Sequence, residues 1–182
     1  MHTAPIAVRL GAAAALVAAA AFATLCGIHI THGTFDDDPS TTVEYVNLLA
    51  FAVALAGSAL AAPALGAATA APAWATRLAC GGPPLVLVGV LATLVTGSSP
   101  SWFGVVAVPG NLGWLAGLTW MAVVAWRGRT LPRWAAAGLP LTVIAGVGLA
   151  QLGGGIVPAL LWAYLAATAL RTSVPRAGQL AS

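Results

Sequence analysis

The chain has 182 residues, of which 60% are hydrophobic and only 6% charged, and its mean hydropathy is +0.95. A soluble domain usually carries about 25% charged residues because its surface faces water, so this composition excludes an ordinary soluble protein. The formal net charge is +3, but the arginines are scattered at the ends of apolar segments, which excludes a basic face for nucleic acid. We expect them to meet anionic lipid headgroups instead.

Six apolar segments predict one domain over residues 1–182, an all-α, polytopic transmembrane helical bundle with six spans. The predicted spans, in chain order, are residues 5–28, 43–71, 78–96, 111–126, 134–152 and 156–170. About 20 residues cross a hydrocarbon core of about 30 Å, so the fourth and sixth spans are short. The first apolar run is longer than that of a usual signal peptide, which favours an uncleaved first helix over a cleaved leader.

The first polar segment, residues 29–42, concentrates the groups that could ligate a metal. These are His29, His32, Asp36, Asp37 and Asp38. Imidazole and carboxylate together can bind a divalent cation. Their spacing matches no established zinc pattern. In addition, catalytic zinc sites usually draw on helices that fix the ligands. A solvated loop on the outer side is therefore the favoured interpretation, with a metal site as the alternative.

Two local features accompany this segment. Thr41 and Glu44 have the spacing of a capping box, in which the hydroxyl and the carboxylate satisfy backbone N–H groups at a helix start. Cys26 and Cys80 are expected near opposite faces of the membrane. A disulfide needs α-carbons within about 7 Å, so we expect both thiols to be free.

Later segments offer few polar side chains. Asn47, Asn111 and Gln151 fall near the outer ends of spans and could line a shared outer cavity. Gly113 and Gly117 form a GxxxG pattern, which lets two helix backbones approach closely in lipid. Packing within the chain is favoured over homodimerisation for this pair. We find no nucleophile held beside a base, and no ionisable residue that falls firmly inside a span, away from its ends.

The charges alternate between successive gaps. The basic residues fall in every second gap between spans: Arg9, Arg77, Arg127, Arg129, Arg133, Arg171 and Arg176. The acidic residues 36–38 and 44 fall in a gap of opposite parity. Basic residues of short loops stay in the cytoplasm. The pattern therefore predicts a cytoplasmic-membrane protein with both termini inside, residues 127–133 inside and residues 29–42 outside.

The stretch Trp126-Arg-Gly-Arg-Thr-Leu-Pro-Arg-Trp134 resembles a short basic "LPRW" turn between late helices of small bacterial six-helix membrane proteins of unknown function. The acidic segment from Phe35 to Tyr45 is similar in placement to their first outer loop. The resemblance supports the topology and implies no activity, so no functional residue carries over.

Three functions are compatible with these patterns. The first is a non-enzymatic accessory or assembly subunit with a membrane-protein partner or a second copy of itself, and without a cofactor. The second is a small permease or channel-like carrier of a neutral solute that uses Asn111 and Gln151. The third is an outer-face metal-dependent enzyme that uses His29, His32 and the aspartates.

Overall fold

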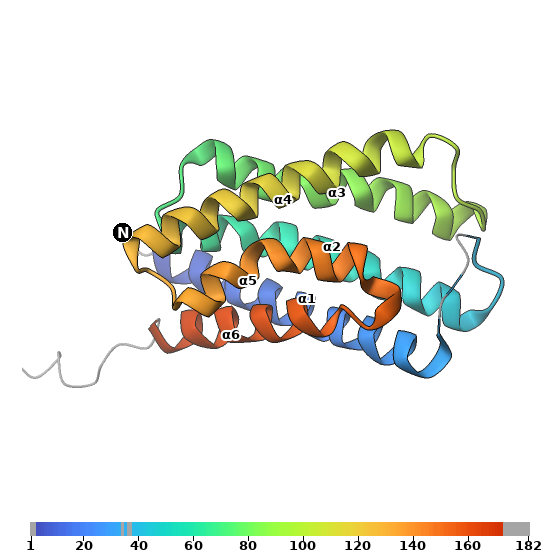
Figure 1. Ribbon diagram of the computed structural model, residues 1–182, viewed down its shortest axis with the longest axis horizontal. Coiled ribbons are helices and arrows are strands. Elements are labelled where there is room, and N and C mark those ends of the chain that lie inside the picture. The colour runs from blue at the N-terminus through green and yellow to red at the C-terminus, as the bar shows by residue number, and fades with distance from the viewer. Residues whose placement is uncertain (1–2, 34, 36–37, 173–182) are drawn as a thin grey trace, which may run out of the picture.

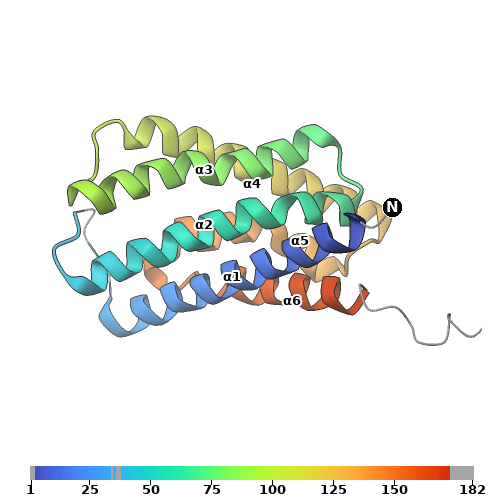
Figure 2. The same ribbon diagram turned by 180° about the vertical axis from the view of Figure 1, so that it is seen from behind.

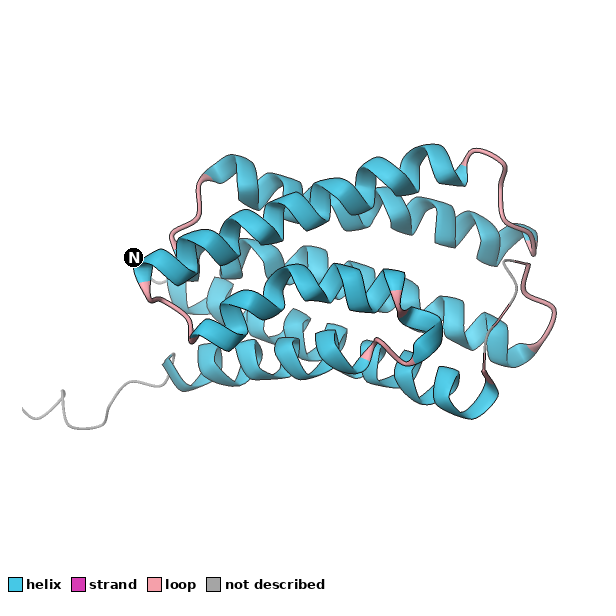
Figure 3. Ribbon diagram, viewed as in Figure 1, coloured by secondary structure: helices cyan, strands magenta, loops and turns pink. Residues whose placement is uncertain are grey.

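The structure is a computed structural model that describes residues 3–33, 35 and 38–172. This part of the chain is helical and contains no strand (Figure 3). Its elements are α1 (Thr3–His32), α2 (Thr42–Thr69), α3 (Ala73–Thr96), α4 (Phe103–Gly128), α5 (Arg133–Val143) and α6 (Ile156–Thr172). A π-helical turn (Ile144–Gly148) and a 3-10 turn (Ala150–Leu152) connect α5 to α6.

The helices form three layers of two, with α3 and α4 in one layer, α2 and α5 in the next, and α1 and α6 in the third (Figure 1). Each helix packs against the next one along the chain, and α6 returns to pack against α1. Figure 2 shows α1, α2 and α3 together on the opposite side. The contacts therefore close into a ring, which places the two ends of the described chain beside each other.

Four of these helices are long and apolar enough to cross a membrane. They are α1, counted from Ile6, and the whole of α2, α3 and α4. Large apolar side chains point away from the bundle along them, and Leu10, Val95 and Val105 are 66%, 86% and 75% exposed. In water such a surface would be costly, whereas lipid tails solvate it. The described part of the chain therefore has the character of a membrane-embedded helical bundle.

Small residues bring the helix backbones together. A Cβ atom added at Gly117 in α4 would lie 2.5 Å from the Ala79 nitrogen and 2.7 Å from the Ala75 oxygen, both in α3. At Gly113, one turn earlier, the nearest atom would be Leu78 Cδ2 at 3.8 Å. Only the second glycine of the GxxxG pair is therefore needed for this close approach, and the approach is made within the chain.

Two segments differ from the expected helices. The fourth helix starts at Phe103 and not at residue 111, so Pro109 lies inside α4 and is exposed. Membrane helices tolerate an interior proline when neighbouring groups satisfy the freed backbone. Residues 134–152 are not one α-helix, because the α-helical pattern stops at Val143. Pro140 and the glycines that follow it weaken this helix. Both cysteines are free, as expected.

We predict that Gly117→Ala lowers the stability of the bundle by about 1–3 kcal/mol, as overpacking usually does. The matched control is Gly113→Ala, where a methyl group fits and alanine favours the helix by up to about 1 kcal/mol. Thermal unfolding of both variants in one detergent measures the difference. Equal melting temperatures would show that the α3–α4 contact does not depend on Gly117.

Candidate functional site

The charged side chains are segregated to the two ends of the bundle. The described arginines lie near the start of α1 and α3, the end of α4, the start of α5 and the end of α6: Arg9, Arg77, Arg127, Arg129, Arg133 and Arg171. The described carboxylates, Asp38 and Glu44, lie at the opposite end (Figure 1). We call these the basic end and the acidic end. Arg176, Asp36 and Asp37 fall outside the described residues.

The acidic end is organised by carboxylates that accept hydrogen bonds from the backbone. Asp38 accepts from the Ser99 N–H at 2.8 Å, which ties the α1–α2 loop to the α3–α4 loop. Glu44 accepts from the Ser40 and Thr41 N–H groups at 2.6 and 2.7 Å, and the Thr41 hydroxyl accepts from the Glu44 N–H at 3.3 Å. The predicted capping box is confirmed. Both carboxylates thus already have a structural role.

The two histidines of the predicted metal site each have a local partner. His29 is buried; its Nδ1 lies 3.2 Å from the Gly33 carbonyl oxygen, and its ring packs against Phe35 with centroids 5.3 Å apart. His32 is exposed, with Nδ1 2.7 Å from the Thr31 hydroxyl. Among the described residues, no three His, Cys, Asp or Glu side chains gather as a metal site would require. Since Asp36 and Asp37 lie outside that part, the full predicted ligand set stays a prediction.

The residues of the predicted outer cavity have different surroundings. The Asn47 and Asn111 Oδ1 atoms are buried and have no hydrogen-bond partner in the described part of the chain. Gln151 is exposed, and its amide donates to the Phe35 carbonyl at 3.4 Å. No hydrogen bond between described residues joins these three side chains, so a shared cavity stays a prediction.

Three further polar groups were missed by sequence reasoning. Ser58 in α2, Trp114 in α4 and Trp162 in α6 are fully buried, and the serine hydroxyl and both indole N–H groups lack a partner among the described residues. A buried polar atom without a partner costs about 1–3 kcal/mol. The sequence gives no signal for Ser58, which lies in an alanine-rich run. The indoles lie within apolar segments and look like core residues.

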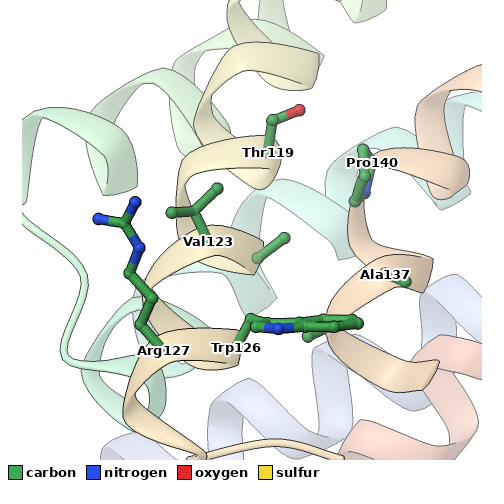
Figure 4. A pocket seen from close by; sticks show the side chains of 8 residues that line it. Thr119, Val123, Trp126, Arg127, Ala137 and Pro140 are labelled. Carbon is green, nitrogen blue, oxygen red and sulfur yellow. The ribbon is translucent and has the colours of Figure 1, made fainter. Parts of the chain in front are cut away.

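A groove of about 440 Å³ lies between α4 and α5, on the basic half of the bundle (Figure 4). Its walls are mostly apolar: Thr119, Ala122, Val123, Trp126 and Arg127 from α4, and Ala136, Ala137 and Pro140 from α5. The α5 wall has only small residues, so no side chain from α5 fills the space beside Val123 and Trp126. We call this space the α4–α5 groove.

The basic end of this groove combines an indole with one guanidinium group. The Trp126 side chain reaches across from α4 toward Ala137 (Figure 4). The Arg133 guanidinium carbon lies 5.5 Å from the centroid of the Trp126 ring, which is cation–π geometry. Arg127 lines the groove, and its guanidinium lies on the other side of α4 (Figure 4). The arrangement offers an apolar slot with positive charge at one end.

No protein family, curated protein or solved structure matches this chain. The proposals below are therefore supported by its sequence and geometry alone.

The capping box at the acidic end gives a direct test. Thr41→Ala removes the hydroxyl that accepts from the Glu44 N–H, and we expect a loss of about 1 kcal/mol in the stability of the bundle. Thr42→Ala is the control, since Thr42 is exposed and makes no comparable contact in the described structure. Thermal unfolding in detergent measures both, and an equal effect of the two changes would rule out capping as the cause.

Proposed function

We propose that the chain is a six-span integral membrane protein of the cytoplasmic membrane. In addition to α1 to α4, the segment from Arg133 to Leu152 and α6 would cross. Both run alongside the long helices from the basic end, and the turn between them lies short of the α1–α2 and α3–α4 loops (Figure 1). With 17 residues, α6 is about 25 Å long at 1.5 Å per residue. This is close to a hydrocarbon thickness of about 30 Å, and local thinning accommodates the difference.

The proposed orientation places the basic end in the cytoplasm. It is supported by the six described arginines at that end and the two described carboxylates at the other. Short loops with arginine are retained inside during insertion. Both termini and residues 127–133 are then cytoplasmic, and residues 29–42 face outward.

For the role of the protein, we propose a non-enzymatic accessory or assembly subunit that binds other components of the membrane. One observation carries this proposal: the sides of the bundle expose large apolar side chains on every helix, and the described charges lie toward its ends. Contacts available along such sides are packing contacts with lipid or with other helices. Leu60 in α2, Leu112 in α4 and Leu160 in α6 are 70%, 60% and 65% exposed and illustrate this surface.

A second candidate, a carrier for a small neutral solute, is favoured by a different observation. The Asn47 and Asn111 oxygens and the Ser58 hydroxyl are buried without a partner in the described structure. In a membrane protein such groups are retained where water or a polar solute can reach them. They would provide neutral hydrogen-bonding groups for a solute without charge.

The six-span topology is tested by cysteine labelling of intact cells. In a Cys26→Ser/Cys80→Ser background, Ser101→Cys, Thr130→Cys and Gln151→Cys are exposed positions in three different loops. We expect a membrane-impermeant maleimide to label positions 101 and 151 in intact cells, and position 130 only after permeabilisation. If position 151 also needs permeabilisation, α5 and α6 do not cross.

The accessory role is tested by purification in a mild detergent, followed by light scattering that separates protein mass from detergent and lipid. We expect a protein mass well above the 18.0 kDa of one chain, with a stoichiometric partner or a second copy. A harsher detergent should reduce the mass to that of one chain. A lone monomer in the mild detergent would contradict the proposal.

A further inference from the structure

We propose that the α4–α5 groove binds one acyl chain of an anionic phospholipid, whose headgroup phosphate is held by Arg133. The inference rests on the proposed orientation, in which the basic end lies at the cytoplasmic headgroups. It assigns the groove a specific lipid, beyond the general solvation of the bundle by the bilayer.

The shape and lining of the groove fit a hydrocarbon chain. The lining residues of α4 run from Thr119 to Arg127, about 12 Å along the helix at 1.5 Å per residue. The groove therefore follows the helix axes, which is also the direction of lipid chains in the proposed orientation. Its volume of about 440 Å³ lies within the range of about 300–1,000 Å³ that is usual for small-molecule sites.

The same dimensions argue against a helix of a partner protein as the occupant. An α-helix is about 10–12 Å wide with its side chains, so the groove is too small to take up more than a short piece of one. A flexible hydrocarbon chain can instead follow the alanine and proline side chains of the α5 wall.

The charges at the basic end of the groove select an anionic headgroup. Arg133 stacks over Trp126, while the described carboxylates, Asp38 and Glu44, lie at the acidic end. No carboxylate in the described part of the chain is therefore close enough to neutralise Arg133. A guanidinium binds phosphate oxygens through paired hydrogen bonds. The Arg127 guanidinium lies on the other side of α4 (Figure 4), so Arg133 is the arginine placed to meet the phosphate.

The test uses the fluorescence of Trp126, which lies in the groove. The full chain is reconstituted in phosphatidylcholine vesicles that contain a small equal fraction of either brominated phosphatidylglycerol or brominated phosphatidylcholine. The Trp126 signal is the difference between the protein and its Trp126→Phe variant. Bromine on an acyl chain quenches only a nearby indole, so we expect stronger quenching by the phosphatidylglycerol.

Two kinds of variant test separately whether the lipid preference depends on the charge and on the space in the groove. Arg133→Gln should lower the preference for phosphatidylglycerol about fivefold. The control Arg171→Gln removes the same charge from an exposed position on α6 and should keep the preference. Ala137→Leu fills the groove and should abolish the preference although Arg133 remains.

Equal quenching of Trp126 by the two brominated lipids would overturn the inference. An equal loss in Arg133→Gln and Arg171→Gln would also overturn it, because charge at the basic end alone would then attract the lipid. The cysteine labelling at positions 101, 130 and 151 is independent of this measurement. Correct labelling without a lipid preference refutes only the lipid site, whereas outside labelling of position 130 refutes the proposed orientation.

Discussion

Close approach of helix backbones at small residues is the constraint on which this bundle depends. In lipid, helices gain little by burying apolar surface against each other, so tight packing must hold them together. Gly57 illustrates this at the α1–α2 contact, where an added Cβ would lie 2.9 Å from the Ala14 oxygen and the Ala18 nitrogen. The α3–α4 contact at Gly82 and Gly117 is equally close. Because the small residues recur along α1 to α4, these helices pack along much of their length.

The α4–α5 groove exists where this packing is incomplete. The α5 wall is made of Ala136, Ala137 and Pro140, which are small and do not reach the α4 side chains. Beyond Pro140 the helix changes to a π-helical turn, and Gly153 takes a left-handed conformation with φ of +79°. Helix α5 is thus both short and poorly interlocked with α4. A space remains beside Trp126, and packing with other components of the membrane would fill it.

Much of the architecture could be predicted from the sequence, because two simple physical signals agree. Apolar stretches long enough to span a membrane indicate the helices, and the alternation of arginine-bearing gaps indicates which of their ends lie together. The described part of the chain has six α-helices, with its arginines at one end. The spacing of Thr41 and Glu44 was also sufficient to predict the capping box, since this motif involves residues only three apart.

The details that failed depend on tertiary context. The predicted fourth span began at residue 111, but the apolar residues before it continue the helix back to Phe103, with Pro109 inside it. The sequence also did not predict the end of the α-helical pattern in α5, because Ile144 and its neighbours continue the apolar pattern of a span. The closure of the ring by α6 against α1 joins residues far apart in sequence, and no local pattern indicates it.

The sequence analysis singled out polar residues and did not predict the α4–α5 groove. Polar side chains are conspicuous in an apolar chain, so the acidic end, with Asp38 and Glu44, attracted the chemical hypotheses. There the described carboxylates are already engaged by backbone N–H groups. The groove is instead lined by alanine, valine, proline and tryptophan, which look like ordinary span residues until α4 and α5 are placed side by side. In a membrane protein, a gap in the apolar packing next to a charged side chain can indicate a binding site. The α4–α5 groove beside Trp126 and Arg133 is such a gap.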